Sequence, residues 1–222
     1  MKIRLSYTLS QNTPLYQGTP SLKIEPVHSI ARGDSANTSE IRFSSHTGTH
    51  IDVPNHFCPE GASVAEFLGE ENVFFPAILV DLPSKKTMID VIDLSIVEQY
   101  PEAEAVLVHT GMEKLRQMKP DTFITEYPFI SQDIPDYLRK TCPDIRLFGT
   151  DTISISHPEN RAAGRACHRN FLCKKPAILI LEDMNLSNPF LKINPFSVDV
   201  YPIVLNSPDG TPVIVFADIP RK

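Results

Sequence analysis

Three of the seven histidines in this chain fall within the eleven residues 46–56, which read HTGTHIDVPNH. His46, His50, Asp52 and His56 all occupy even positions, so in an extended strand their side chains project from one face. A helix is disfavoured because a glycine and a proline interrupt the stretch, and its threonine, isoleucine and valine residues prefer strands. The sequence therefore predicts an extended ribbon that presents two imidazoles and a carboxylate to one point, with a third imidazole just beyond.

Imidazole and carboxylate are ligand types that suit zinc, manganese or iron. The stretch offers too few protein groups to saturate a metal ion, which is typical of a catalytic site because room is left for water. His56 is either a fourth ligand or an uncoordinated general acid/base. The alternative interpretation is a strand whose histidines satisfy local hydrogen bonds, but four such side chains on one face favour a metal.

The length and composition restrict the class of protein. With 222 residues, 41% hydrophobic and 22% charged, the sequence fits one globular domain spanning 1–222. A net charge of −6 and the lack of a Lys/Arg run argue against a nucleic-acid surface. No apolar stretch has membrane-spanning length, and the first residues lack the apolar core of a signal peptide. We therefore expect a cytoplasmic protein without a membrane partner.

The four cysteines show no C-x-x-C pair and no regular framework of spacings. They are Cys58, Cys142, Cys167 and Cys173. We expect reduced and mostly buried thiols, as in an ordinary cytoplasmic protein. Cys58 lies two residues past His56 and could line the site, but no companion base marks it as a nucleophile.

Several segments have the pattern of β-strands. Continuous apolar runs, typical of strands buried on both faces, occur at 77–82, 105–108 and 177–181. Further strands are expected at 2–9, 22–30 and 39–45, and the last of these would run directly into the histidine ribbon. The segments 199–206 and 211–217 flank a Ser-Pro-Asp-Gly turn and predict a hairpin.

Helices are fewer. Helical patterns occupy 93–100 with Asp93 as N-cap, 133–140 with Pro135 in the first turn, and about 161–174. Ser63 is a candidate cap for a short helix through Leu68. Several doubly buried strands with few helices predict a mixed α/β domain, built on one large sheet or a barrel-like core.

The stretch HTGTHIDVPNHF resembles the H-x-G-T-H-x-D-x-P-x-H signature of the cyclase family of metal-dependent hydrolases, which includes bacterial kynurenine formamidase and isatin hydrolase. The resemblance implies a swivelling β/β/α domain with a mixed, partly barrel-like sheet. It also implies a homodimer or homotetramer in which loops of one subunit reach the site of its neighbour. The family's metal is divalent; we expect zinc, with manganese or iron as alternatives, and one or two ions.

The same resemblance extends the candidate site. His168 on the helix and Glu182 at the end of the next strand match a second group of metal ligands, with Asp52 bridging the two ions. Their separation of fourteen residues is about two more than the family pattern, which leaves His157 as a substitute for His168. Tyr16, in the loop Leu-Tyr-Gln-Gly, resembles an aromatic that walls the substrate pocket, although simple packing of a half-buried ring explains it equally well.

Three more positions follow from the resemblance. His109, before a Thr-Gly turn, either approaches the site or only satisfies a strand end. Asp151, in the segment Gly-Thr-Asp-Thr-Ile-Ser, is suited either to support a metal ligand or to cap a turn. The family often has an arginine in the last strand where Ile214 stands here, so no role is assigned to that position.

Three functions are compatible with these residues. The first is a metal-dependent hydrolase of amide, formamide or cyclic amide C–N bonds, similar to an arylformamidase and acting on a small molecule. The second is a metal-dependent cyclase or lyase acting on a polar carbonyl compound, which would use the same ligands. The third is a non-catalytic metal-binding protein, which would have a closed coordination sphere.

Overall fold

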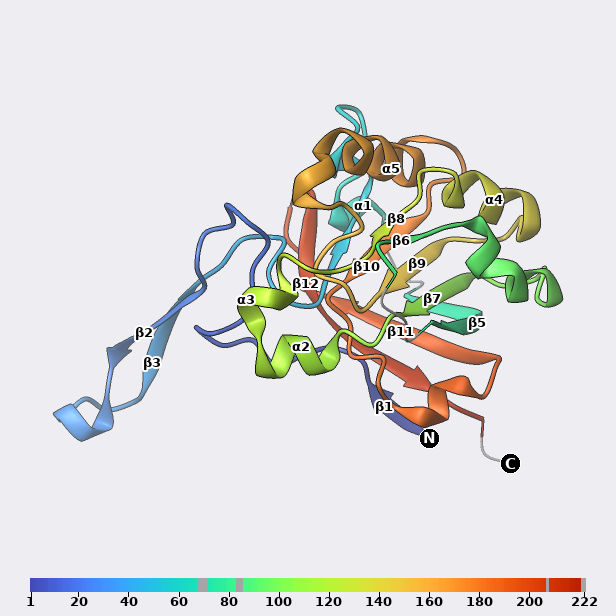
Figure 1. Cartoon of the computed structure of the whole chain (residues 1–222). Coiled ribbons are helices and arrows are strands. Elements are labelled where there is room, and N and C mark those ends of the chain that lie inside the picture. Colours follow the sequence, from blue (N-terminus) through green and yellow to red (C-terminus); the bar gives the residue numbers. More distant parts are fainter. Residues whose placement is uncertain (68–71, 83–85, 207, 221–222) are drawn as a thin grey trace.

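The computed structural model describes residues 1–67, 72–82, 86–206 and 208–220 and shows a mixed α/β fold built around one eight-stranded sheet (Figure 1). The order of the strands in this sheet is β1-β12-β11-β5-β7-β9-β10-β4, and an additional β12–β4 pairing closes most of it into a barrel. The strands are β1 (Lys2–Arg4), β4 (His50–Asp52), β5 (Val73–Asp81), β7 (Ala105–His109), β9 (Leu147–Thr150), β10 (Leu179–Glu182), β11 (Phe196–Pro202) and β12 (Gly210–Asp218).

The remaining elements surround this sheet. The two small sheets pair β2 (Lys23–His28) with β3 (Thr38–Arg42) and β6 (Met88–Ile89) with β8 (Phe129–Ile130). The α-helices are α1 (Val64–Phe67), α2 (Glu113–Met118), α3 (Pro120–Phe123), α4 (Ile134–Thr141) and α5 (Arg161–Cys173). The 3-10 helices are η1 (Ile30–Arg32), η2 (Pro54–His56), η3 (Val91–Gln99), η4 (Pro158–Asn160) and η5 (Pro189–Lys192). The expected mixed α/β fold with a barrel-like sheet and few helices is confirmed.

The four central strands are parallel neighbours and are buried on both faces. Strands β5, β7, β9 and β10 pair in parallel, as expected for the continuous apolar runs. Alternate residues of β7 enter two different cores: Leu107 packs inside the barrel, whereas Val106 and Val108 pack beneath η3, α4 and α5. Each of these strands ends in a polar residue: Asp81, His109, Thr150 and Glu182.

The hairpin at the end of the sequence is confirmed. Strands β11 and β12 are antiparallel, and β12 also pairs with β1 and with β4. The last of these pairings places Gly210 opposite Asp52. On its other side β4 pairs with β10, where Glu182 lies opposite His50. The short strand β4 is thus held between residues from the last third of the chain.

The prediction of one continuous ribbon over residues 46–56 is wrong. Only His50–Asp52 form a strand, because Gly48 adopts a left-handed φ of 62° before it and Pro54 begins the 3-10 helix η2 after it. Likewise, β3 ends at Arg42 and does not run directly into β4. The left-handed turn at Gly48 costs little conformational free energy, because glycine tolerates this backbone region freely.

Two of the helix predictions hold, and the third is corrected both in helix type and at its cap. Helix α4 begins after Asp133 with Pro135 in its first turn, and α5 begins at Arg161, as expected. The segment expected at 93–100 is instead the 3-10 helix η3, and its N-cap is Asp90 rather than Asp93. Asp93 takes the N3 position of a capping box with Asp90, so it still satisfies the first turn.

Two smaller observations concern α1 and the membrane expectation. The hydroxyl and backbone N–H of Ser63 both donate to Glu66 Oε2 as α1 begins, whereas Leu68 lies outside the described residues. Among the helices in the described part of the chain, none is long and apolar enough to cross a membrane.

The expectation that all cysteines are reduced is wrong for one pair. Cys58 and Cys173 form a disulfide, with Cα atoms 5.7 Å apart, whereas Cys142 and Cys167 are buried free thiols. The partners are 115 residues apart, so spacing could not reveal the pair. The bond joins the segment after η2 to the last residue of α5.

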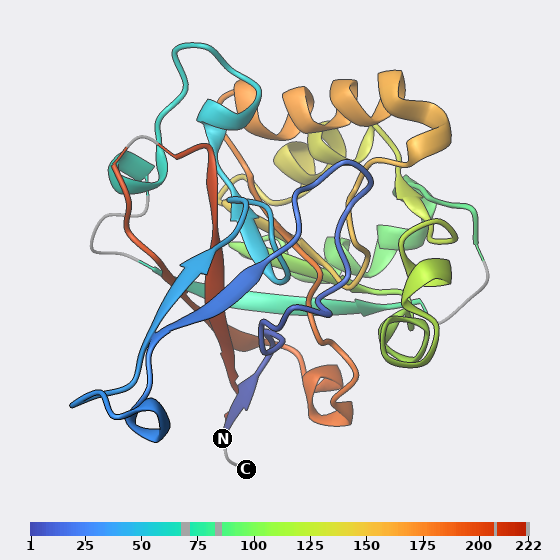
Figure 2. The same ribbon diagram turned by 90° about the vertical axis from the view of Figure 1, so that its left-hand side faces the viewer.

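The β2–β3 hairpin projects from the body as an arm (Figures 1 and 2). None of the residues in these two strands is buried. Val27 and Ile41 expose 52% and 58% of their surface, so the arm carries apolar surface that the body of the protein does not cover.

Candidate metal centre and active site

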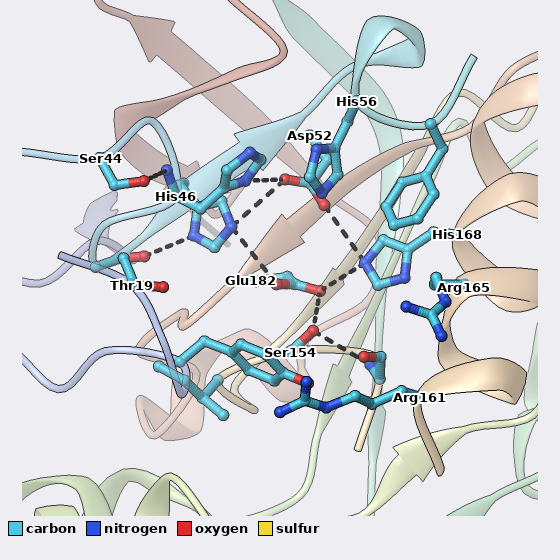
Figure 3. Close-up of a pocket in the computed structure, with 16 residues that line it drawn as sticks. Thr19, Ser44, His46, Asp52, His56, Ser154, Arg161, Arg165, His168 and Glu182 are labelled. Atoms are coloured by element: carbon cyan, nitrogen blue, oxygen red, sulfur yellow. Dashed lines mark hydrogen bonds and ion pairs between the residues drawn. The ribbon is translucent and has the colours of Figure 1, made fainter. Parts of the chain in front are cut away.

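The predicted site residues converge at one end of a cavity of about 350 Å³ (Figure 3). His46, His50, Asp52, His56, His168 and Glu182 all line it, and Tyr16 forms part of its wall. The site draws on β4, η2, α5 and the end of β10, which the closed sheet brings together.

His50 is fixed in one tautomer by the turn before β4. Its ring nitrogen Nδ1 lies 2.8 Å from the carbonyl oxygen of Gly48, so Nδ1 carries the proton and donates it. The other nitrogen, Nε2, is therefore unprotonated, and its lone pair is available to a cation inside the cluster. A histidine that donates Nδ1–H to a carbonyl and presents Nε2 is oriented as metal-binding histidines usually are.

His168 repeats this arrangement from a helix. Its Nδ1 lies 2.8 Å from the carbonyl oxygen of Gly164, one turn earlier in α5, and its ring stacks on Phe57. Only 4% of His168 is exposed, and its Nε2 points into the cluster. The substitute that the sequence left open, His157, packs against Tyr127 outside the cavity lining.

Two carboxylates lie between these two imidazoles. Asp52 places Oδ1 3.4 Å from His50 Nε2 and Oδ2 3.6 Å from His168 Nε2. Glu182 places Oε2 3.5 Å from His50 Nε2 and Oε1 3.6 Å from His168 Nε2. These separations are long for hydrogen bonds but suit atoms that share a cation at about 2.0–2.2 Å from each ligand.

A buried oxygen of Asp52 supports the fit to a metal ion. Asp52 is 1% exposed, and its Oδ2 has no hydrogen-bond partner among the described residues. Leaving such an oxygen unpaired is costly unless a cation compensates for the lost solvation. The donor set, with nitrogen and oxygen atoms only, suits zinc, manganese or iron.

Hydrogen bonds fix the side chain of Glu182 and the residue that follows it. Its Oε1 accepts hydrogen bonds from Ile155 N at 2.7 Å and from Ser154 Oγ at 3.1 Å. The next residue, Asp183, has a φ of 53° and accepts a bidentate pair from Arg116 at 2.6 and 2.7 Å. Thr49 Oγ1 donates to the carbonyl oxygen of Asp183, which ties β10 to the start of β4.

His46 and His56 share a partner that the sequence analysis did not identify. Asp209 Oδ2 lies 2.9 Å from His46 Nε2 and 3.1 Å from His56 Nδ1. The other nitrogen of His46 lies 2.8 Å from Asp52 Oδ1. Gly210 permits this close approach, since a Cβ there would lie 2.8 Å from His46 Cε1 and 2.7 Å from the Ile51 carbonyl oxygen.

These contacts shift the pKa values of the cluster. Burial alone would raise the pKa of Asp52, but His46 and His50 hold it well below its usual range. Burial alone would lower the pKa of His46, whereas Asp52 and Asp209 raise it to about 10. Hydrogen bonds from His46 and His56 lower the pKa of Asp209. Asp52 and Asp209 therefore stay ionised, and an ionised carboxylate is what a metal ligand such as Asp52 requires.

Matches to known proteins accord with this geometry. The Cyclase family model matches residues 3–157, which is more than half of the chain. The chain belongs to the Cyclase family. A relative is the kynurenine formamidase of Geobacillus thermodenitrificans (strain NG80-2), 29% identical over 212 residues, covering 95% of this chain and 94% of the relative. The kynurenine formamidase of Bacillus cytotoxicus is 27% identical, with the same shares covered.

Solved structures show the same fold as this Cyclase family member. Isatin hydrolase A from Labrenzia aggregata, bound to benzyl benzoate, aligns with a TM-score of 0.81 and 19% identity, covering 100% of this chain and 94% of the other. A structure described as a predicted metal-dependent hydrolase from Bacillus stearothermophilus has a TM-score of 0.77 and 22% identity. That alignment covers 98% of this chain and 97% of the other.

Three residues considered from the sequence lie apart from this Cyclase-family site. His109 contacts Asp81 at 2.6 Å and Glu113 at 3.2 Å in a separate cluster and does not line the cavity. Asp151 accepts hydrogen bonds from the backbone of the turn after β7, including Gly111 N at 2.8 Å, so it caps that turn. Cys58 is occupied by its disulfide.

The sequence analysis also missed two cavity-lining arginines, Arg161 and Arg165 of α5. Both lie on the helix face that carries His168, as the i, i+4 and i+7 spacing requires. That spacing is visible in the sequence and could have identified them once His168 was chosen.

Proposed function

We propose that this protein is a metal-dependent hydrolase of amide or formamide C–N bonds, similar to an arylformamidase. The observation that carries the proposal is the pair of carboxylates, Asp52 and Glu182, each placed between the Nε2 atoms of His50 and His168. The names of the relatives, kynurenine formamidase and isatin hydrolase, support the reaction type. We further propose that residues 1–222 form a single catalytic domain.

The proposed ligands are His46, His50, Asp52, His168 and Glu182, for one or two divalent ions, with zinc as the first choice and manganese or iron as alternatives. A bound divalent cation supplies Lewis acidity, which acidifies water and polarises a carbonyl group. His46 enters this set only if one of its two carboxylate contacts gives way, because both of its ring nitrogens face carboxylates.

His56 is the proposed general acid/base. Asp209 holds its Nδ1 at 3.1 Å and so fixes the ring, leaving Nε2 to exchange protons with the cavity. In hydrolysis, water oxygen bonds to the carbonyl carbon while Nε2 takes the water proton. When the C–N bond breaks, Nε2 returns that proton to the leaving nitrogen. The ion pair with Asp209 stabilises the imidazolium between these two transfers.

The wall of the cavity restricts the substrate to a small molecule with an apolar part. Tyr16, Phe57 and Ile153 contribute apolar surface, and Ser44 and Thr19 contribute hydroxyl groups. We propose Tyr16 as a substrate-binding residue on this basis. An aromatic ring next to the scissile group fits such a mixture of surfaces.

We also propose a homodimer or homotetramer located in the cytoplasm. The projecting β2–β3 arm supports an assembly, because its exposed Val27 and Ile41 would be buried by a second copy. The measurement is the molar mass in solution by light scattering, with V27D/I41D as the variant that should reduce it.

The experiment that tests the proposed function joins metal analysis to substrate screening. Purified protein is analysed for metals and assayed with formanilides, lactams and lactones in ¹⁸O-labelled water. Label in the carboxylic acid product supports hydrolysis. Turnover without label indicates a cyclase or lyase instead. Metal binding without turnover of any of these compounds, in a site closed to water, indicates a non-catalytic protein.

A further inference from the structure

The face of α5 that carries His168 also carries two arginines. Arg161, Arg165 and His168 follow the i, i+4, i+7 spacing, and all three line the cavity. With a rise of 1.5 Å per residue, the Cα atoms of Arg165 and Arg161 lie roughly 4.5 and 10.5 Å along the helix axis from that of His168. Figure 3 shows both arginines on the same side of the cavity as His168.

These arginines lack acidic partners in the described part of the chain. Arg165 makes no hydrogen bond or ion pair there, and Arg161 donates only to Gln17 Oε1, at 3.2 Å and exposed. Four other arginines in the described residues, Arg42, Arg116, Arg139 and Arg146, pair with carboxylates, whereas Arg4, Arg32 and Arg169 do not.

Arg161 and Arg165 differ from the other arginines without an acidic partner in that both line the cavity. Two guanidinium groups left without one, at the edge of a cavity, give that edge a positive charge that is available to a ligand. A guanidinium presents a planar fork of donors that matches a carboxylate in a bidentate pair.

We propose that Arg165, assisted by Arg161, binds an anionic group of the substrate, a carboxylate in the first instance. The preferred substrates are then N-acyl anilines that carry a carboxylate about one ring's breadth from the bond that is broken. The apolar wall formed by Tyr16, Phe57 and Ile153 accommodates the ring between the two ends. This proposal rests on the proposed hydrolase function and assigns its specificity to two side chains.

The test compares two ligands that differ only in charge. One is a formanilide with a carboxylate on a short ring substituent, and the other is the corresponding primary carboxamide, which has the same shape. Steady-state kcat/KM is measured for both substrates with the metal-loaded wild type and with R165Q. Binding of the two deformylated anilines is measured by titration calorimetry, so that the result does not depend on turnover.

The matched control is R169Q. Arg169 is an exposed arginine of the same helix, one turn after Arg165, and it lies outside the cavity lining. R169Q changes the net charge as R165Q does. It therefore separates a local contact with the ligand from a general effect of charge on a ligand of opposite sign.

We expect the wild type to prefer the anionic ligand by about tenfold or more, as a charge-assisted bidentate pair provides. R165Q should lose this preference, R165K should keep part of it, and R169Q should keep all of it. R161Q should have a smaller effect than R165Q, because Gln17 already engages Arg161.

Two results would overturn the proposal: no preference for the anionic aniline in the wild type, or a preference that survives in R165Q. In the second case the carboxylate binds elsewhere, for example at the metal. If neither formanilide is hydrolysed but calorimetry shows the Arg165-dependent preference, the proposed reaction fails while the anionic subsite stands.

Discussion

Asp209 and His56 are 153 residues apart in the sequence, yet Asp209 Oδ2 lies 3.1 Å from His56 Nδ1. The same oxygen contacts His46, so one partly exposed carboxylate orients two of the imidazoles of the site. The pairing of β12 with β4 produces this relationship, because Gly210 lies opposite Asp52 in that register. The general acid/base proposed above therefore depends on a residue of the final hairpin.

Replacing Asp209 by asparagine tests this dependence. With D209N at saturating metal, we expect kcat to fall about 10- to 100-fold, the usual cost of removing a partner that orients a functional histidine. The control is S45A, which removes only the hydroxyl that donates to Asp209 Oδ1 at 2.9 Å and should cost less than tenfold. A kcat for D209N equal to that of the wild type would contradict the role of His56.

Substitutions of Asp52 and His56 should separate metal binding from proton transfer. Asp52→Asn removes the charge shared by two imidazoles, so metal content and activity should both be lost. His56→Ala should lower kcat by about 10²–10⁴ while metal content stays unchanged. Elemental analysis after desalting and steady-state kinetics measure the two effects, with H28A on the exposed strand β2 as control. Unchanged metal content in D52N would show that the ligand set is wrong.

Treatment with a chelator should abolish activity and lower the thermal stability of the wild type. A bound cation would compensate four ionisable groups whose side chains are each at most 6% exposed, so its removal leaves buried charges uncompensated. Activity and melting temperature should return when one divalent metal is added back, and comparing zinc, manganese and iron identifies the metal. The variant D52N should show no change in melting temperature on chelation.

The disulfide between Cys58 and Cys173 should stabilise the fold and the site together. Cys58 follows His56 by two residues and Cys173 follows His168 by five, so the bond joins two segments that carry site residues. We expect C58S/C173S to lose about 2–4 kcal/mol of unfolding free energy in denaturant titrations and to bind metal more weakly. Reductant should destabilise the wild type and leave the double variant unchanged.

Alkylation of the denatured, unreduced protein checks the bond directly. Two modified cysteines, Cys142 and Cys167, are expected by mass spectrometry, and four would contradict the disulfide. The same measurement on protein alkylated within intact cells tests the proposed cytoplasmic location, because the cytosol keeps most thiols reduced.

His109 should make stability depend on pH. Burial alone would lower the pKa of His109, but Asp81, Asp151 and Glu113 raise it above its ordinary value of about 6.5. A raised folded-state pKa means that the stabilisation is complete below the unfolded-state pKa and is lost as pH rises through the folded-state pKa. Thermal melts of the wild type and H109Q should therefore differ more at pH 6 than at pH 9. An equal difference at both pH values would contradict the ion pairs.

Local patterns in the sequence were enough to predict the central strands and α5. The apolar run around Leu107 is typical of a doubly buried strand, and the caps of α4 and α5 lie in the sequence next to their helices. The convergence of His46, His50, Asp52 and His56 was also predicted, but for an incomplete reason. A turn at Gly48 and the helical turn at Pro54 bring these side chains together, rather than one extended strand.

Relationships between distant segments could not be predicted in the same way. Asp209 becomes part of the site only through the β12–β4 pairing, and Cys58 meets Cys173 only because α5 packs over η2. Neither pairing leaves a trace in local composition or periodicity. Arg161 and Arg165 could be predicted only in part. Their helical spacing from His168 is visible in the sequence, but their lack of an acidic partner depends on the fold.

Strand β12 pairs with β1, β4 and β11, and Asp209 comes directly before it. A ribosome must therefore synthesise the chain through β12 before the barrel can close, and Asp209 must be made before His46 and His56 gain their shared partner. Until then the nascent polypeptide contains His46 and His56 but lacks the carboxylate that orients their rings. The site residues near the start of the chain are therefore ordered only after the segment that carries Asp209 and β12 has been made.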